Sequence, residues 1–162
     1  MTLSIRRMKD EDISQVQHVA KTGWHDTYKE IIPLNIQEVF LNFAYSHKML
    51  QERIRQSVML VAEYNGEIVG FANYSPIKKE NQSELSAIYI QPEFQRRGIG
   101  TALLTEGIKT LRGIREIFVN VEKENKVGTS FYKRKGFKII SEFDDNFDGH
   151  ILKTVRMFLA IN

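Results

Sequence analysis

The sequence has no cysteine among its 162 residues. Disulfide bonds and thiolate ligands for a structural zinc are therefore excluded. A cysteine nucleophile is excluded as well, because no thiol is present to carry an acyl group as a covalent intermediate. If the protein transfers acyl groups, it must pass them directly from donor to acceptor.

Long apolar segments are also missing. No stretch reaches the roughly 18 consecutive apolar residues that a membrane-spanning helix needs. The first residues, MTLSIRRMKDEDIS, lack the apolar core of a secretory signal peptide. We therefore expect a cytoplasmic protein that does not enter a membrane.

Neither sign of charge dominates the sequence. Its 23 Lys and Arg residues and 20 Asp and Glu residues give a formal net charge of +3. This balance does not indicate a nucleic-acid-binding surface, and we expect no nucleic acid partner. Basic residues nevertheless gather in the second half of the chain, at Arg96, Arg97, Lys123, Lys126, Lys133, Arg134 and Lys135. An anionic ligand would explain this group, although a solvated helix face explains its last three members equally well.

The length and the hydrophobic periodicity favour one mixed α/β domain spanning residues 1–162. With 42% hydrophobic residues the chain can bury a sizeable core, and it is too short for two typical domains. The periodicity predicts strands at residues 3–8, 58–64, 67–74, 83–90, 116–122 and 150–159, with a further strand starting at Phe137. It predicts helices at residues 13–23, 36–43, 48–56, 98–111 and 125–135, with Asp10 and Asn125 as N-caps and Gly136 as a C-terminal cap.

Two features predict how strands pair. Asn65-Gly66 lies between two apolar runs and is a strong signal for a tight antiparallel hairpin. The strands at residues 83–90 and 116–122 are separated by a helix, which predicts that they are parallel.

The segment QRRGIGTALL, residues 95–104, has the organisation of a phosphate-binding loop that opens a helix. It follows a predicted strand and a short loop containing Pro92. Gly98 and Gly100 lack a Cβ atom, so the backbone can turn sharply and a ligand can approach its amides. A helix N-terminus adds unpaired N–H groups and partial positive charge, which suit a pyrophosphate.

Two common phosphate-binding motifs do not fit this segment. A Walker A loop requires a lysine directly after its last glycine, but Thr101 follows Gly100. The dinucleotide motif requires a third glycine, where this sequence has Leu103. A glycine-rich turn from strand to helix, without a ligand, remains the plain alternative.

The remaining pattern is Gln/Arg-x-x-Gly-x-Gly/Ala, here Gln95 to Gly100, preceded by Ile88-Tyr89-Ile90-Gln91-Pro92. It resembles the coenzyme A loop of the GNAT superfamily of N-acetyltransferases. The resemblance covers nearly the whole chain. It implies the GNAT fold: a mixed, mostly antiparallel twisted sheet, flanked by helices, whose central parallel strands splay apart to bind acetyl-CoA.

The same resemblance implies acetyl-CoA as co-substrate and no metal. Backbone groups of the strand before the loop would pair with the pantetheine arm, and one of their N–H groups would polarise the thioester carbonyl. The implied cofactor-binding residues are Ile88, Tyr89, Ile90, Gln95, Arg96, Arg97, Gly98, Ile99, Gly100, Thr101, Asn125 and Tyr132.

Two side chains receive chemical roles from the resemblance. Tyr132 matches the tyrosine that protonates or hydrogen-bonds the departing sulfur, although it could serve packing alone. The acceptor amine, with a pKa near 10.4, must lose a proton near neutral pH. Glu84 lies in the strand where the family often places an acidic residue that acts directly or through water. A solvent-facing Glu84 at the start of a strand is the alternative.

No motif identifies the acceptor. The stretch TGWHDTYKEIIP looks like that of bacterial GNAT proteins, including those that resemble polyamine acetyltransferases. A polycation could be received by the acidic residues Asp26, Glu30, Glu84, Asp144, Asp145 and Asp148. We expect a small primary amine, with spermidine or spermine favoured, or a protein N-terminus; amino acids and aminoglycoside-like amines are further alternatives.

A non-catalytic acyl-CoA-binding sensor is the alternative function, and a homodimer is common in the family. The run DDNFDG at residues 144–149 resembles half of a calcium-binding EF-hand loop. Val155 stands where that loop requires a glutamate, so we predict an acidic hairpin loop instead. The four histidines lack metal-ligand spacing.

Overall fold

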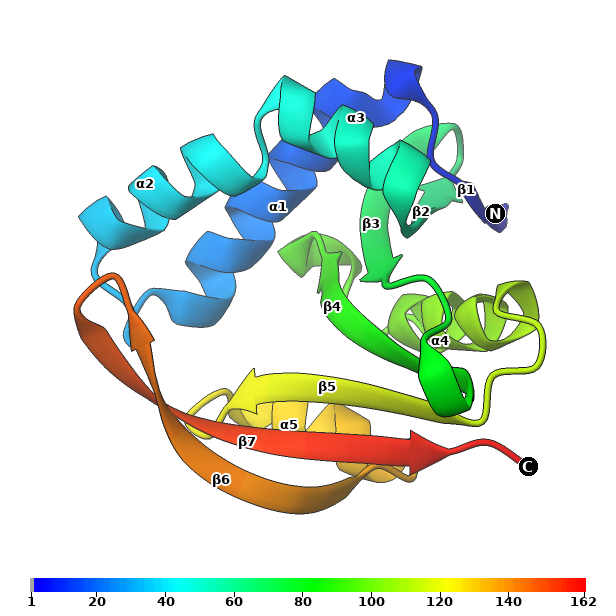
Figure 1. Ribbon diagram of the computed structural model, residues 1–162. Helices are drawn as coiled ribbons and strands as arrows, with labels where there is room; N and C mark the ends of the chain where they lie inside the picture. The colour runs from blue at the N-terminus through cyan, green and yellow to red at the C-terminus, as the bar shows by residue number, and fades with distance from the viewer. Residues whose placement is uncertain (1) are drawn as a thin grey trace.

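The computed structural model describes residues 2–162. These residues form one seven-stranded sheet in the order β1-β2-β3-β4-β5-β7-β6 (Figure 1). The strands are β1 (Leu3–Arg7), β2 (Val58–Tyr64), β3 (Glu67–Tyr74), β4 (Gln82–Ile90), β5 (Glu116–Glu122), β6 (Lys138–Phe147) and β7 (His150–Ala160). Neighbouring strands are antiparallel except β4 and β5, which are parallel. The predicted mixed sheet with one parallel pair is therefore confirmed.

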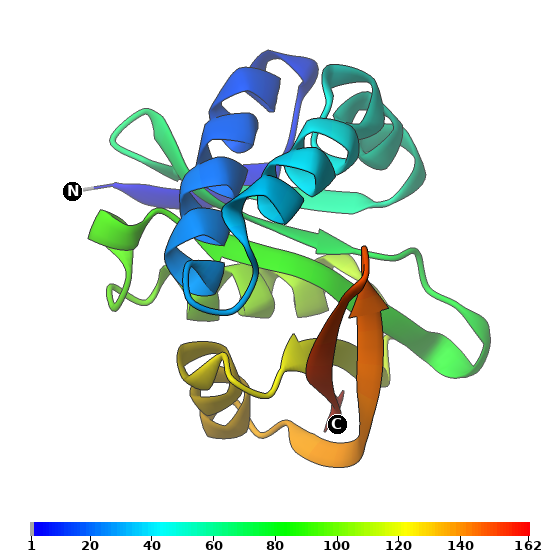
Figure 2. The ribbon, with the colours of Figure 1, turned by 90° about the vertical axis from the view of Figure 1, so that its left-hand side faces the viewer.

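Helices cover both faces of this sheet. They are α1 (Ile13–Tyr28), α2 (Leu34–Ala44), α3 (His47–Gln56), α4 (Ile99–Thr110) and α5 (Lys126–Arg134). Figure 2 shows α1 and α2 crossing one face while α4 lies on the other. Successive residues of β2 alternate between the two layers: Met59 and Val61 pack under α1 and α3, and Leu60 and Ala62 pack with α4. A strand covered on both faces is apolar throughout, as this one is.

The Asn65-Gly66 hairpin forms as predicted between β2 and β3. Both residues have positive φ angles, 51° and 83°. Two successive left-handed residues match the twist of the flanking strands, which explains the short connection.

Helix α1 is longer than the sequence predicted. It was expected to end near Gly23, but it continues to Tyr28. Gly23 serves close packing instead, because a Cβ atom there would lie 3.1 Å from Cβ of Tyr89 on β4. The glycine lets α1 approach the sheet and does not stop the helix.

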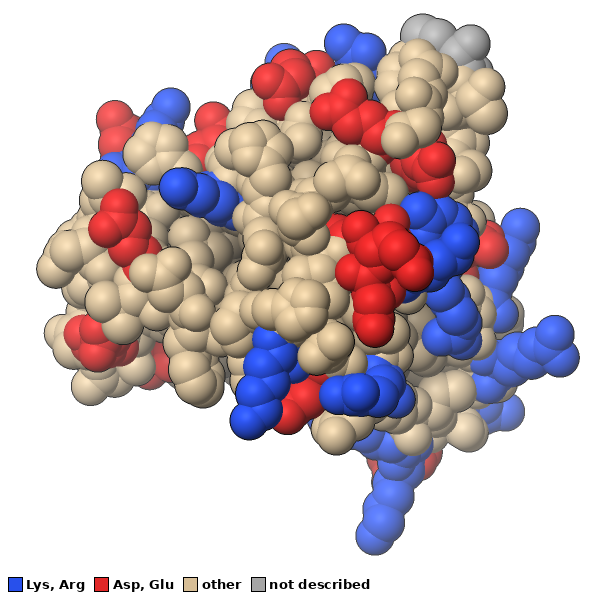
Figure 3. All heavy atoms as spheres, turned by 90° about the horizontal axis from the view of Figure 1, so that it is seen from above, with Lys and Arg blue, Asp and Glu red and all other residues tan. Residues whose placement is uncertain are grey.

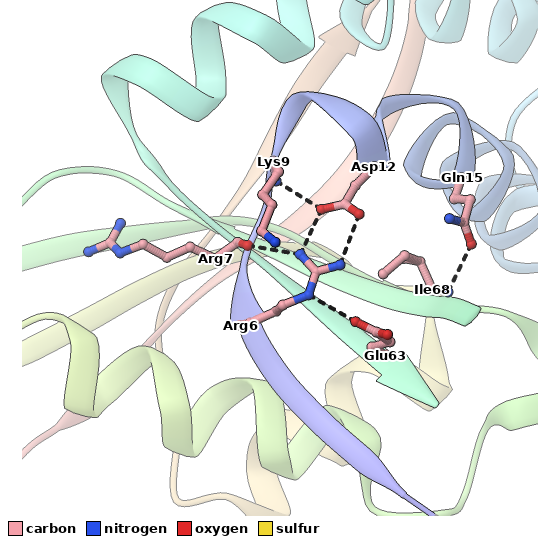
Figure 4. Close-up of polar contacts among 7 residues, drawn as sticks. All are labelled: Arg6, Arg7, Lys9, Asp12, Gln15, Glu63 and Ile68. Atoms are coloured by element: carbon pink, nitrogen blue, oxygen red, sulfur yellow. Dashed lines mark hydrogen bonds and ion pairs between the residues drawn. The ribbon is translucent and has the colours of Figure 1, made fainter. Parts of the chain in front are cut away.

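The predicted N-cap at Asp10 is also wrong, because residues 10–12 form a 3₁₀ turn and the helix starts after Asp12. Asp12 is buried and accepts two hydrogen bonds from the Arg6 guanidinium, at 2.8 and 2.9 Å, and one from the Lys9 amide (Figure 4). Arg6 also bonds Glu63 at 2.9 Å. Hydrogen bonding to the charged Arg6 guanidinium therefore holds the pKa of the Asp12 carboxyl below its usual range. The same contacts link β1 to the start of α1.

The acidic run at residues 144–148 was predicted to be a hairpin loop, but most of it belongs to β6. Only Asp148 and Gly149, with positive φ angles of 50° and 84°, make the turn. Asn146 supports it by accepting a hydrogen bond from the Gly149 amide at 2.8 Å. The alternation of Phe143 and Phe147 with polar residues continues the strand. The hairpin therefore reaches the connection between α1 and α2, where His150 contacts the Ile31 carbonyl at 2.8 Å.

Strands β4 and β5 are paired only at their beginnings. The pairs are Gln82 with Glu116, Ser83 with Ile117 and Glu84 with Phe118. Beyond Glu84 the two strands diverge, as Figure 1 shows. The side of β4 that faces β5 therefore has no strand partner along residues 85–90, although its other side pairs with β3 as far as Ile90. We call this opening the β4–β5 wedge.

Among residues 2–162, the structure has no helix that combines the length and the apolar character required to cross a membrane.

Candidate active site

The N-terminus of α4 presents backbone amides without partners. Gly98 caps the helix with a φ angle of 80°, and Arg96 before it has a φ angle of 64°. Both residues therefore adopt the left-handed conformation that glycine tolerates best. The first backbone hydrogen bond of α4 runs from Ala102 to the Gly98 carbonyl. The amides of residues 98–101 thus have no helical acceptor. They belong to the helix end at which the sequence predicts anion binding.

Glycine is required at position 100 for packing, whereas the sequence suggested that it lets a ligand approach the backbone. A Cβ atom there would lie 3.1 Å from the ring of Phe131 and 3.4 Å from Cδ1 of Ile90. The glycine therefore allows α4 and α5 to pack closely, whereas open space surrounds the Cβ position of Gly98. Room for a ligand beside the loop is provided at Gly98.

Tyr132 lies on α5, buried between the rings of Phe131 and Phe137. Burial raises the pKa of its phenol, and the negative charge of Glu122 raises it further. The hydroxyl group therefore keeps its proton at neutral pH, as a proton donor must. Asn125 is the N-cap of the same helix, as predicted, because its Oδ1 atom accepts a hydrogen bond from the Gly128 amide at 2.9 Å.

Glu84 is held by an arginine. Both of its carboxylate oxygens accept hydrogen bonds from Arg156 on β7, and Arg156 also bonds Oδ1 of Asn120 at 3.0 Å. The sequence did not predict this ion pair, because its partners are 72 residues apart. The pairing leaves neither oxygen of Glu84 without a partner.

An aromatic cluster lies on the other side of β4, between the C-terminal half of α1 and the tip of the β6–β7 hairpin. Trp24 is at its centre and contacts the rings of Tyr28, Phe40, Tyr89 and Phe147 at centroid distances of 4.5 to 6.3 Å. A cavity of about 350 Å³ borders the cluster, lined by Trp24, Phe40, Tyr45, Arg53, Asn73, Ser86, Ala87 and Tyr89. Its size suits part of a small molecule or a peptide end.

None of the acidic residues predicted to receive a polycation lines this cavity. Asp26 lines a separate hollow on the outer side of α1, together with Lys21 and Lys29. Asp144 contacts Lys153 at 3.5 Å. The helical face seen in Figure 3 carries acidic and basic side chains interspersed among uncharged ones. The structure brings Asp145 within electrostatic range of Glu122.

Glu122, the last residue of β5, is a site residue that the sequence did not reveal. Its Oε1 atom is shielded from solvent and has no hydrogen-bond partner in the described chain. The same is true of Nε1 of Trp24. Burial raises the pKa of Glu122, and hydrogen bonding to Tyr28 opposes the increase. A glutamate at the C-terminal end of the second parallel strand was the available signal, but the alternation at residues 116–122 predicted only a strand.

Among residues 2–162, no three His, Asp or Glu side chains are grouped so that they could hold a metal ion.

Comparison with known proteins agrees with this architecture. The sequence model of the Acetyltransferase (GNAT) family matches residues 24–137. The spermidine N(1)-acetyltransferase of Thermoplasma acidophilum is 33% identical over 147 residues, which cover 86% of this chain and 90% of that protein. An uncharacterized N-acetyltransferase of Bacillus subtilis is 33% identical over 151 residues, covering 90% and 85% of the two chains.

The fold also matches a solved structure. The crystal structure of the PaiA N-acetyltransferase from Thermoplasma acidophilum in complex with coenzyme A superposes with a TM-score of 0.86 at 29% identity, over 99% of this chain and 100% of that one. The β4–β5 wedge and the α4 loop therefore define a protein of the acetyltransferase class. The chain belongs to the GNAT family and is an N-acetyltransferase.

Proposed function

We propose that this protein transfers an acetyl group from acetyl-CoA directly to a primary amine. The observation that carries the proposal is the juxtaposition of two features: the β4–β5 wedge and the unpartnered amides of residues 98–101. A pyrophosphate suits the amides, and an extended amide-containing arm suits the unpaired side of β4. The absence of cysteine excludes an acyl-cysteine intermediate.

The residues present fit acetyl-CoA as co-substrate. Gly98 leaves open space beside the helix end, and residues Gln95 to Thr101 together with Asn125 would hold the phosphates and the arm. Backbone groups of Ile88, Tyr89 and Ile90 would bind next to the thioester, which supplies the acetyl group. Tyr132 would hydrogen-bond the departing sulfur and give it a proton.

Glu84 is the residue that the sequence predicts as the base, and this role stays a prediction. Both of its carboxylate oxygens accept hydrogen bonds from Arg156, so Glu84 would receive a proton through water or after displacement of the arginine. Substitution by glutamine tests this role, and a maximal rate and pH profile equal to those of the wild type would contradict it.

A polyamine such as spermidine or spermine is the favoured acceptor. It is supported by the 33% identical relative named spermidine N(1)-acetyltransferase and by the acidic pair of Glu122 and Asp145 beside the aromatic cluster. A protein N-terminus is the second candidate. Arg53 in the cavity favours it, because its guanidinium has donors beyond the one that bonds the Ala44 carbonyl and these could bind a carbonyl group of a peptide.

The experiment that tests the proposal is thiol release from acetyl-CoA across a panel of amines, followed with a thiol-reactive dye. The panel contains spermidine, spermine, amino acids, peptides and aminoglycosides, and the protein itself gives no thiol signal. Turnover with one class identifies the acceptor. Silence across the panel, with acetyl-CoA still raising the melting temperature, would replace the proposal with the sensor function. A cytoplasmic location and a homodimer stay predictions.

A further inference from the structure

Glu122 occupies an unusual position for a carboxylate. It ends β5 opposite Thr154 of β7, at the open end of the β4–β5 wedge. One of its oxygens is shielded from solvent without any partner among the described residues. A buried polar atom of this kind costs free energy unless a ligand satisfies it.

The groups that face Glu122 come from four elements. Tyr28 on α1, Tyr89 on β4 and Tyr132 on α5 present phenols to it, and Asp145 on β6 is the one charged group among them. Asp145 carries the same sign of charge as Glu122. No cation among the described residues acts on Glu122, in contrast to Glu84, which Arg156 neutralises.

This environment is complementary to an ammonium group. A primary ammonium offers three donors and a positive charge, which match the unpartnered oxygen, the acidic neighbour and the phenol oxygens. Glu122 also lies within electrostatic range of Tyr132, the residue proposed to protonate the departing sulfur. The place where the amine would arrive and the place where the thiol would leave are therefore adjacent.

We propose that Glu122 binds the ammonium group of the acceptor and takes its proton, with Tyr28 and Tyr89 orienting the carboxylate. This catalytic role rests on the proposed acetyl transfer. In this mechanism the proton goes to Glu122, a carboxylate without a counter-ion among the described residues. Glu84, which Arg156 binds, has only a supporting role on the neighbouring strand.

The proton and bond changes balance without a further reactant. Glu122 removes one proton from the ammonium, and the freed nitrogen pair forms the C–N bond with the acetyl carbon. The C–S bond breaks and its electron pair leaves on sulfur. Nitrogen releases a second proton as the amide forms, sulfur gains one by way of Tyr132, and Glu122 returns its proton to water.

The pH dependence follows from the carboxylate being needed in its ionised form. Activity of the wild-type protein falls as the pH drops through the pKa of Glu122, which burial raises. The glutamine variant lacks this group, so it can use only the free amine, which increases about tenfold per pH unit below the amine pKa of about 10.4.

The test compares Glu122→Gln with Glu124→Gln, which removes an exposed carboxylate two residues away. We expect Glu122→Gln to lower kcat/KM about 100-fold at pH 7, with the deficit shrinking steadily as the pH rises toward 10. Glu124→Gln should keep the wild-type profile. Stabilisation by coenzyme A, measured as the shift in melting temperature, should be the same in both variants and shows that the fold is intact.

Other results overturn the proposal in distinguishable ways. A deficit that is equal at every pH would assign Glu122 a structural role only. A kcat/KM deficit that shrinks with rising pH in Glu84→Gln, and no such deficit in Glu122→Gln, would make Glu84 the base. A wild-type protein that acetylates no amine in the panel would overturn the proposed function itself, and the role of Glu122 with it.

Discussion

The hydroxyl oxygens of Tyr28 and Tyr89 lie 3.1 Å apart, so a hydrogen bond between two phenols joins α1 to the end of β4. Tyr28 also interacts with Glu122 and lowers the pKa of that carboxyl. The Tyr28 hydroxyl group therefore lies where the helix, the strand before the α4 loop and the end of β5 come together.

Substitution of Tyr28 by phenylalanine should shift the acidic limb of the kcat/KM profile to higher pH. The ring and its packing on Trp24 are preserved, but the hydrogen bond that stabilises the ionised form of Glu122 is lost. The pKa of Glu122 then rises, and a larger fraction of the carboxyl is protonated at pH 7. The profile is measured from pH 5 to pH 10 with the amine that gives the best turnover.

The double variant with Glu122→Gln is the control for this prediction. Without the carboxyl, Tyr28→Phe should leave the shape of the profile unchanged. A shift of equal size in the double variant would show that Tyr28 acts through some other group.

The contrast between Glu84 and Glu122 shows what could be predicted from the sequence. Both lie in correctly predicted strands, since period-2 alternation and the Asn65-Gly66 hairpin depend on local chemistry. Their surroundings depend on contacts between distant segments: Arg156 reaches Glu84 from β7, and Tyr28 reaches Glu122 from α1. No local pattern encodes such contacts.

The glycines show the same difference between local chemistry and contacts with distant segments. Gly98 was correctly expected to permit a sharp turn, since its φ angle of 80° lies in the left-handed region. Gly23 and Gly100 are required for close packing against Tyr89 and Phe131. That role depends on the partner element, so Gly23 was mistaken for the end of a helix.

Substitution of Gly98 by alanine should weaken coenzyme A binding about tenfold and destabilise the fold by about 1 kcal/mol. The φ angle of 80° is strained for alanine, and relaxation of the backbone would turn the amides of residues 98–101 away from the phosphates. The Kd is measured by isothermal titration and the stability by urea unfolding.

Gly66→Ala is the matched control, because Gly66 has a φ angle of 83° and equally open surroundings in the β2–β3 hairpin. It should cost similar stability and leave the Kd unchanged. Equal effects of both variants on the Kd would mean that the loop is not the phosphate site.

Substitution of Tyr132 by phenylalanine should lower kcat about tenfold without abolishing turnover. The hydroxyl group is lost while the ring stays between Phe131 and Phe137. A thiol with a pKa near 8.5 is already a fair leaving group, which is why some activity should remain. Single-turnover kinetics measure the chemical step, and a rate equal to that of the wild type would remove Tyr132 from the mechanism.

Glu122→Gln should stabilise the folded protein at neutral pH while it lowers activity. The pKa of Glu122 is higher in the folded than in the unfolded state, so ionisation disfavours folding. This penalty is absent at pH values below the pKa of Glu122 in the unfolded state, about 4.3. It is complete at pH values above the raised pKa of Glu122 in the folded state. The free energy of unfolding of the variant should therefore exceed that of the wild type at pH 8 and approach it at pH 4.

Urea unfolding at the two pH values measures this difference, with Glu124→Gln as the variant that should show none. A difference of the same size at pH 4 and pH 8 would mean that the carboxylate carries no ionisation penalty in the fold. Greater stability combined with a kcat/KM deficit that shrinks as the pH rises would have one physical explanation: the unpartnered charge of Glu122 is unfavourable for folding and is retained because it binds the acceptor's ammonium group.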